Sequence, residues 1–303
     1  MGFLKIYIRK YWKLFLIAIL FLSFETICDL LQPTIMSKIV DIGVAGKNLN
    51  FILKMGGLML LITFCGAIAA VARNFISSNV SQKFGTQLRL DLYKKIQSLS
   101  FENLDKFENA SLITRLTNDI TMVQNFANGL MRIFVKAPLL CLGAIIMAIN
   151  LNPGLSIIIL VIVPIVISFI IINLKIGFPL FINVQKSLDK LNGVLREYLS
   201  GVRVVKAFNR FVYEKERFEN ANENQVKSAT KAMRIMSFFA PGIGFTVNIG
   251  IVLVIWIGGL NVNNKQMHVG QIIAFVNYMS QILFSLMAIS MVFTTFVRAK
   301  ASA

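Results

Sequence analysis

The sequence predicts an all-α membrane protein with six transmembrane helices, and three observations support this fold class. First, 56% of its 303 residues are hydrophobic and only 15% are charged, with a mean hydropathy of +0.70; a soluble domain of this size cannot bury so much apolar surface. Second, six apolar stretches are long enough to cross a hydrocarbon core of about 30 Å, which requires roughly 20 helical residues. Third, the basic residues gather between alternate stretches. The stretches are residues 14–36, 54–76, 130–150, 154–176, 236–260 and 270–296.

The distribution of basic residues predicts the orientation of these helices. Of the 31 Lys and Arg residues, 25 lie before the first stretch, in residues 83–136 and 186–234, or close to the C-terminus. The connections on the opposite side of the membrane contain only Lys47, Lys54 and Lys265. Because positively charged loops stay in the cytoplasm, we expect a multi-pass protein of the cell membrane with both termini cytoplasmic. The net charge of +17 therefore follows from membrane topology and predicts no nucleic-acid partner.

Two features that suggest other classes of protein have simpler interpretations. The basic residues before the first stretch resemble the start of a signal peptide, but no small-residue cleavage site follows, so we expect an uncleaved helix. Cys28, Cys65 and Cys141 lie within apolar stretches without metal-ligand spacing, and His268 lies in a predicted outward loop. The sequence therefore predicts no disulfide, metal site, cofactor site or catalytic group in this chain.

The second and fourth apolar stretches are expected to continue as helices well beyond the membrane. Residues 51–99 contain no proline and would form a helix roughly 70 Å long, and the helix from Gly154 to Phe208 would reach roughly 80 Å. We expect Pro164 and Pro179 to bend the longer helix locally. In the shorter one, apolar residues recur every three or four positions, which predicts an amphipathic cytoplasmic part. These residues are Val80, Phe84, Leu88, Leu92, Ile96 and Leu99.

Each extension is expected to return to the membrane through another helix. The first return helix is predicted to restart near Ser111, whose hydroxyl suits an N-cap. The pattern then repeats, so the chain divides into two sets of three helices, about residues 1–150 and 151–303, joined around Pro153. Parallel repeats of this kind are common in transporters, where substrate sites form between the halves.

The tips of the two extensions read "LSFENLDKFENASLITRLTNDI" and "LREYLSGVRVVKAFNRFVYEKERF". Both resemble the intracellular loops of ATP-binding cassette (ABC) exporters with the six-helix type I transmembrane domain, and helix count and loop placement extend this resemblance over nearly the whole chain. The resemblance is strongest in residues 111–120 and 201–208. In the first loop the family usually has Gly followed by an acidic residue, where this chain has Ala110 and Ser111.

The resemblance implies that the two tips are coupling helices, at about residues 101–108 and 209–216, which dock on ATP-binding domains. The residues expected to make this contact are Phe101, Glu102, Asn103, Leu104, Asp105, Lys106, Phe107, Asn209, Arg210, Phe211, Tyr213 and Glu214. A membrane protein that is moved by a soluble motor needs rigid levers, and long helical extensions can transmit such a displacement.

The resemblance also implies the partners of the chain. The sequence contains no G-x-x-x-x-G-K-[ST] loop to cradle ATP phosphates. We therefore expect it to be no ATPase by itself, and we expect ATP and Mg²⁺ to bind in a nucleotide-binding domain that follows residue 303. Similarity to bacterial multidrug and lipid exporters implies a dimer of six-helix subunits, identical or different, and outward transport of amphipathic, drug-like compounds or lipids.

Two acidic residues in the first stretch are candidates for contact with the cargo. Glu25 and Asp29 lie four residues apart on one helical face, and charged residues inside a membrane usually face an aqueous cavity or a partner. Counting helical rise places Arg73 much nearer the inner headgroups than Glu25, so Arg73 is expected to extend its side chain to the interface. The acids then attract cationic amphipathic cargo, or form a hydrogen-bonded structural pair between helices.

The fifth and sixth stretches contain weaker candidates. In the fifth, Pro241 is expected to remove a backbone hydrogen bond, and Gly242, Gly244 and Gly250 to permit either close packing or a hinge. The sixth carries a comparatively polar helical stripe that lines a substrate cavity or packs against other helices. The stripe consists of Asn277, Gln281, Phe284, Ala288, Met291 and Thr295.

Three alternative functions compare less well with these patterns. A six-helix ion channel would need a re-entrant selectivity loop or a voltage sensor with regularly spaced arginines, and the sequence has neither. A secondary transporter driven by an ion gradient would explain the intramembrane acids but not the long cytoplasmic helices. A lipid flippase of the same family fits equally well, because the sequence does not distinguish an amphipathic drug from a lipid.

Overall fold

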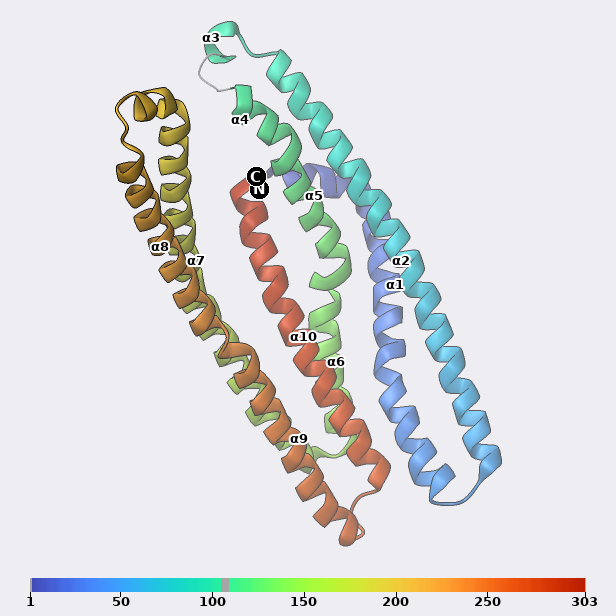
Figure 1. The fold of residues 1–303 in the computed structure, drawn as a ribbon. Coiled ribbons are helices and arrows are strands. Elements are labelled where there is room, and N and C mark those ends of the chain that lie inside the picture. Colours follow the sequence, from blue (N-terminus) through green and yellow to red (C-terminus); the bar gives the residue numbers. More distant parts are fainter. Residues whose placement is uncertain (1, 105–108, 303) are drawn as a thin grey trace. The chain divides into compact units, whose positions relative to one another are not determined.

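A computed structural model describes the backbone of residues 2–104 and 109–302, and the side chains of residues 12–100, 102–103, 110–289 and 291–292 (Figure 1). This part of the chain is helical and contains no strand. It forms two packing units, Met1–Val161 with Gly250–Ala303, and Ile162–Ile249. Within these described residues, six helices are long and apolar enough to cross a membrane, which confirms the predicted fold class. The packing units differ from the two consecutive three-helix sets, because the middle part of the chain packs on itself.

The first unit is built around α10 (Val269–Ser302), which packs against both α1 (Gly2–Lys38) and α6 (Lys136–Leu151). Leu22, Phe275 and Tyr278 from these helices are fully buried. The remaining elements of this unit are η1 (Ile39–Val44), α2 (Leu49–Gln97), α3 (Phe101–Leu104), α4 (Asn109–Thr114), η2 (Arg115–Asp119), α5 (Ile120–Gly129) and η3 (Leu130–Phe134).

Pro33 lies inside α1, and α10 supplies hydrogen bonds around the gap that it leaves. Proline has no N–H, so the carbonyl oxygen of Asp29 loses its helical donor. The Gln281 amide donates to this oxygen at 3.4 Å. One turn away, the Tyr278 hydroxyl donates to the Leu30 carbonyl oxygen at 2.7 Å and lies 2.7 Å from the Thr34 hydroxyl. Since an unpaired backbone group is costly inside a membrane, these bonds fix α10 against α1.

A carboxylate cap joins the C-terminal end of α1, through η1, to the N-terminal end of α10. Asp41, in η1, accepts a hydrogen bond from the backbone N–H of Gly270 at 2.6 Å and another from the Ser37 hydroxyl at 3.0 Å. A carboxylate is favourable at the positive end of the α10 dipole. A Cβ at Gly270 would lie 2.4 Å from the Ser37 carbonyl oxygen, so only glycine allows this approach.

The second unit is a hairpin of α7 (Pro153–Ala207) and α8 (Phe211–Met236), followed by the start of α9 (Phe239–Asn263) (Figure 1). α7 is one continuous helix of 55 residues that contains both Pro164 and Pro179. Its pairing with α8 is antiparallel, and the hydroxyls of Ser187 and Ser228 lie 3.0 Å apart. The sequence predicted two helices that are longer than a bilayer requires. The structure confirms both, with 49 residues in α2 and 55 in α7.

Two local predictions were wrong. α4 already begins at Asn109, so Ser111 lies within the helix and is not its N-cap. Pro241 lies in the first turn of α9, where an N–H has no helical acceptor to lose; the chain breaks instead at residues 237–238, between α8 and α9. A Cβ at Gly242 would approach Phe169 to 3.1 Å, so this glycine serves close packing between α9 and α7.

Candidate functional site

The tip of the second unit exposes large apolar side chains. Residues 208–210 form the turn between α7 and α8, and Asn209 adopts a left-handed φ of 49°. Around this turn Phe208, Phe211 and Tyr213 are 74%, 62% and 57% exposed. A cluster of exposed aromatic side chains on a polar helix pair is typical of a protein-binding surface. A separate short helix was predicted at residues 209–216. The structure does not have it, because α8 begins at Phe211 and continues without interruption.

Polar contacts below the tip hold its two helices together. Arg217 of α8 donates to the carboxylate of Glu197 on α7, and its other terminal nitrogen lies 3.9 Å from Glu214 Oε2. Glu214 therefore turns back along the hairpin, whereas the neighbouring Asn209 and Arg210 are exposed. The Arg217 side chain is partly exposed, so we expect these pairs to orient the tip and to add little stability.

The tip of the first unit is described in part. α3 (Phe101–Leu104) is the short helix predicted there. Glu102 and Asn103 are exposed, and the Asn103 amide donates to the Ser100 hydroxyl at 3.1 Å. The structure describes only the backbone of Phe101 and Leu104. The candidates Asp105, Lys106 and Phe107 lie outside the described residues.

The extended part of α2 touches α5 at a close joint. A Cβ at Gly85 would lie 2.1 Å from Oε1 of Gln124, a side chain that is itself buried. The Ser81 hydroxyl donates to the Gln124 carbonyl oxygen at 2.9 Å, and Arg89 donates to the Thr121 hydroxyl at 3.1 Å. This α2–α5 joint connects the first extension to its return helix. The predicted amphipathic stripe is confirmed here, since Val80 and Phe84 are buried.

A cluster of four charged side chains joins α1, α2 and α6. Glu25 accepts a hydrogen bond from Arg73 Nε at 2.7 Å and from Lys136 Nζ at 2.6 Å. Lys136 Nζ also lies 2.9 Å from Asp29 Oδ2. The side chains of Glu25 and Arg73 are each 8% exposed, whereas those of Lys136 and Asp29 are 28% and 35% exposed. Two acids and two bases balance, and only the Lys136–Asp29 side is accessible.

The prediction that Arg73 lies too close to the inner headgroups to reach Glu25 was wrong. α1 continues through η1 to Val44, so the end of the first span that leads into α2 lies further from Glu25 than the apolar run indicated. Helical side chains also lean toward the N-terminus of their own helix. Because α1 and α2 are antiparallel neighbours, Glu25 and Arg73 lean toward each other. Lys136 was missed by the sequence reasoning, although it directly precedes the apolar part of the third span.

The predicted stripe on α10 separates into two kinds of position. Asn277, Phe284 and Met291 are exposed, the last two by 68% and 70%. Gln281 is half-buried and, as described above, supports the α1 backbone. The Thr295 side chain lies outside the described residues. Among the side chains that the structure describes, no group of three His, Cys, Asp or Glu residues is placed to hold a metal ion.

In the part of the chain that the structure describes, six helices long and apolar enough to span a membrane, long helical extensions and an internal charge cluster indicate a multi-pass membrane domain of the transporter class. The family comparison is specific: residues 15–287 match the model of the ABC transporter transmembrane region. The chain belongs to this family, which confirms the resemblance noted from the tip sequences.

In curated relatives, the region that matches this chain makes up about half of a longer protein. The chain is 33% identical over 296 residues to the uncharacterized ABC transporter ATP-binding protein YfiB of Bacillus subtilis (strain 168), covering 98% of this chain and 52% of the relative. It is 34% identical over 305 residues to the uncharacterized ABC transporter ATP-binding protein MT1311 of Mycobacterium tuberculosis (strain CDC 1551 / Oshkosh), covering 100% and 52%. The chain thus spans about half the length of these relatives.

Proposed function

We propose that this chain is the substrate-translocating membrane part of an ATP-driven exporter in the cell membrane, with both termini in the cytoplasm. The observation that carries the proposal is the pair of helical extensions with exposed tips, found in a domain whose relatives are named ATP-binding proteins. The tips serve no purpose within the membrane. An ATP-binding domain outside this chain is the partner that their length and exposed aromatic side chains suit.

In this proposal, ATP and Mg²⁺ bind to that other domain, and this chain converts its movement into a change of the membrane helices. Two such chains, identical or different, form the transporter. A displacement at the tips passes along α2, α5, α7 and α8 as rigid-body motion. ATP binding and hydrolysis then bias an equilibrium between inward-facing and outward-facing states. Family membership argues against transport driven by an ion gradient.

The tip of the second unit provides the test of this coupling. Replacing Phe208, Phe211 and Tyr213 together with serine removes the exposed aromatic surface without touching the membrane part. We expect ATP-driven transport by the intact transporter to fall at least tenfold, the effect of losing about 1.4 kcal/mol or more of docking free energy. Transport into inverted vesicles, with ATP hydrolysis measured in parallel, would check this.

The matched control is Leu199→Ser, which also removes an exposed apolar side chain from α7 but lies about two helical turns before the tip. It should leave transport close to the unsubstituted level. Equal transport by the triple variant and the control would argue against docking at this tip.

For the cargo, we propose an amphipathic compound, either drug-like or a lipid, that meets the accessible side of the charge cluster. Asp29 suits this role better than Glu25, because its side chain is 35% exposed and Glu25 is enclosed by two bases. The exposed Asn277, Phe284 and Met291 of α10 would form a further part of the surface that the cargo contacts.

The cargo proposal predicts a selective effect of Asp29→Asn. Transport of a cationic amphiphile such as an acridinium or rhodamine dye should fall several-fold, while transport of a neutral amphiphile of similar size should change little. The physical reason is the loss of one negative charge at a partly exposed position in low dielectric. Competition assays in the same vesicles would measure both. Equal losses for the two classes would indicate that Asp29 is structural, and transport of a fluorescent phospholipid alone would favour the lipid alternative.

A further inference from the structure

The α7–α8 hairpin leaves the membrane at a level that the sequence and packing define together. Residues 153–174 of α7 contain no charged side chain, and their helical length of about 33 Å fills a bilayer core. Lys175 therefore lies at the boundary. A Cβ at Gly177 would lie 2.8 Å from Met236 Cε, so the break between α8 and α9 at residues 237–238 lies at the same level. Arg234 follows one turn beyond it.

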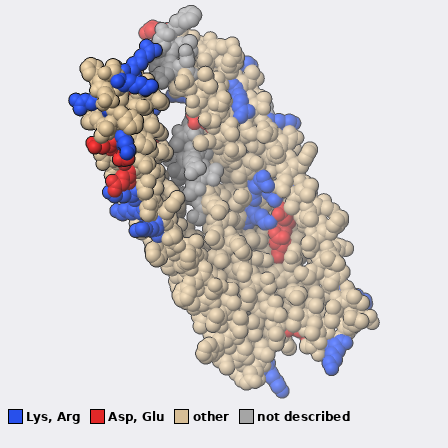
Figure 2. All heavy atoms as spheres, viewed as in Figure 1, with Lys and Arg blue, Asp and Glu red and all other residues tan. Residues whose placement is uncertain are grey.

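This boundary carries a concentrated positive charge that acidic residues compensate only in part. The two facing stretches, residues 175–188 and 224–239, contain five Lys or Arg residues and no Asp or Glu. Lys227 binds Glu223 at 2.8 Å, just outside the second stretch. Lys231 and Arg234 have no ion-pair partner among the residues that the structure describes. In Figure 2 charged side chains gather toward the tip end of this hairpin, and the surface over most of α9 carries none.

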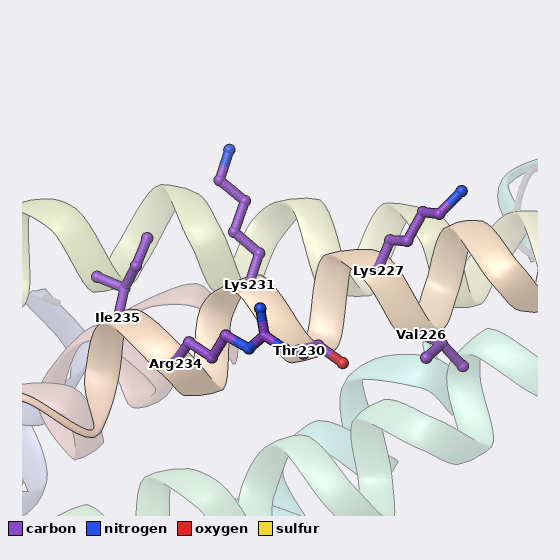
Figure 3. Close-up of a pocket in the computed structure, with 6 residues that line it drawn as sticks. All are labelled: Val226, Lys227, Thr230, Lys231, Arg234 and Ile235. Carbon is purple, nitrogen blue, oxygen red and sulfur yellow. The ribbon is translucent and has the colours of Figure 1, made fainter.

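The unpaired cations border a shallow hollow of about 420 Å³ on α8, lined by Val226, Lys227, Thr230, Lys231, Arg234 and Ile235. Figure 3 shows Lys227 and Lys231 projecting to one side of the helix and the Arg234 side chain running back toward Thr230. Large apolar side chains flank this surface, with Met233 between Lys231 and Arg234 along α8 and Phe238 on the membrane side. Met233 and Phe238 are 74% and 77% exposed, which is unusual for a helix surface in water but suits contact with acyl chains.

We infer that the α8 basic patch, defined as Lys227, Thr230, Lys231 and Arg234, binds the head group of an anionic phospholipid. Arg and Lys form charge-assisted hydrogen bonds with phosphate oxygens, and a hydroxyl adds a further donor. Basic side chains next to a spanning helix are attracted to anionic lipid. A soluble anion would gain nothing from Met233 and Phe238, whereas a lipid uses both the cations and the apolar flank. With the orientation proposed above, the lipid belongs to the inner leaflet.

The test uses the intact transporter in detergent, titrated with phosphatidylglycerol or phosphatidylcholine, with bound lipid counted by native mass spectrometry. We expect phosphatidylglycerol to bind in preference to phosphatidylcholine, and the variant Lys231→Gln/Arg234→Gln to weaken its binding about tenfold or more. The matched control is Arg203→Gln/Lys206→Gln, which removes the same charge from exposed positions on α7 roughly 40 Å from Lys175. The exchange Lys231→Arg/Arg234→Lys should keep the binding and show that the site tolerates substitution.

Several outcomes would overturn the inference. Equal loss of lipid by the two Gln variants would indicate general attraction by net charge. Displacement of phosphatidylglycerol by inorganic phosphate at the same concentration would indicate a site for a soluble anion. Unchanged binding by Lys231→Gln/Arg234→Gln would place the lipid elsewhere. Phe238→Ser provides an independent measurement, since it should weaken binding of long-chain but not of short-chain phosphatidylglycerol. This result does not depend on whether the tips couple to ATP hydrolysis.

Discussion

Glu25→Gln is expected to be among the most destabilising single substitutions in the membrane part, lowering the free energy of unfolding by about 3–5 kcal/mol. The Glu25 carboxylate binds both Arg73 and Lys136, at 2.7 and 2.6 Å. After substitution, Lys136 still has Asp29, but the enclosed Arg73 guanidinium is left with no carboxylate partner among the side chains that the structure describes. An unpaired buried charge is costly to keep away from water. Unfolding in mixed detergent micelles, followed by circular dichroism, would measure the loss.

Two further variants separate this effect from a general effect of losing a carboxylate. Asp29→Asn makes the same chemical change on the same face of α1, at a side chain that is 35% exposed and whose ion-pair partner among the described residues is Lys136. We expect it to lower stability by about 1 kcal/mol or less. Glu25→Gln/Arg73→Gln should recover much of the loss, because no unpaired charge is then left. If Glu25→Gln were no less stable than Asp29→Asn, the cluster would contribute little to the fold.

The outcome bears on what Glu25 and Asp29 do. Sequence reasoning left open whether the two acids attract cargo or form a structural pair. The geometry divides them: Glu25 is the centre of the ion-pair cluster, and Asp29 lies at its accessible edge. A strong stability loss for Glu25→Gln together with a selective transport loss for Asp29→Asn would assign one role to each residue.

The six spans and their extensions could be predicted from sequence because both depend on local periodicity. Apolar runs, charge-free segments and the stripe through Val80 and Phe84 each depend on a single helix. Contacts between helices were less accessible. The Glu25–Arg73 pair depends on the offset of two antiparallel helices and on the direction of long side chains, and simple counting of helical rise misplaced Arg73 by enough to exclude the pair.

The α2–α5 joint was missed for a similar reason. Gly85 lies in an amphipathic run of the sequence. A glycine there shows that the helix surface has no side chain at this position, but it does not show which residue of another helix packs against it. Its partner Gln124 is 39 positions further along and would ordinarily be expected on a solvated face. Only the packed pair shows that the buried amide occupies the position of the missing Cβ.

Gly85→Leu is expected to separate the two helices at this joint and to reduce transport per ATP hydrolysed several-fold. The new side chain would begin 2.1 Å from Gln124 Oε1 and 2.7 Å from its Cδ, and the buried Gln124 cannot simply turn into solvent. Overpacking of this kind costs about 1–3 kcal/mol, and it acts where the first extension must move as one body. Vesicle transport and ATP hydrolysis by the intact transporter, measured on the same preparation, would give the ratio.

The joint also offers a control and a rescue. Gly57→Leu makes the same change on α2 at a position where a Cβ would meet nothing within 4 Å, so transport and stability should both stay near the unsubstituted values. Gly85→Leu/Gln124→Ala restores room for the leucine and should recover a large part of the transport ratio, as expected for two residues in direct contact. Loss of transport that Gln124→Ala does not relieve would mean that Gly85 is needed for something other than this contact.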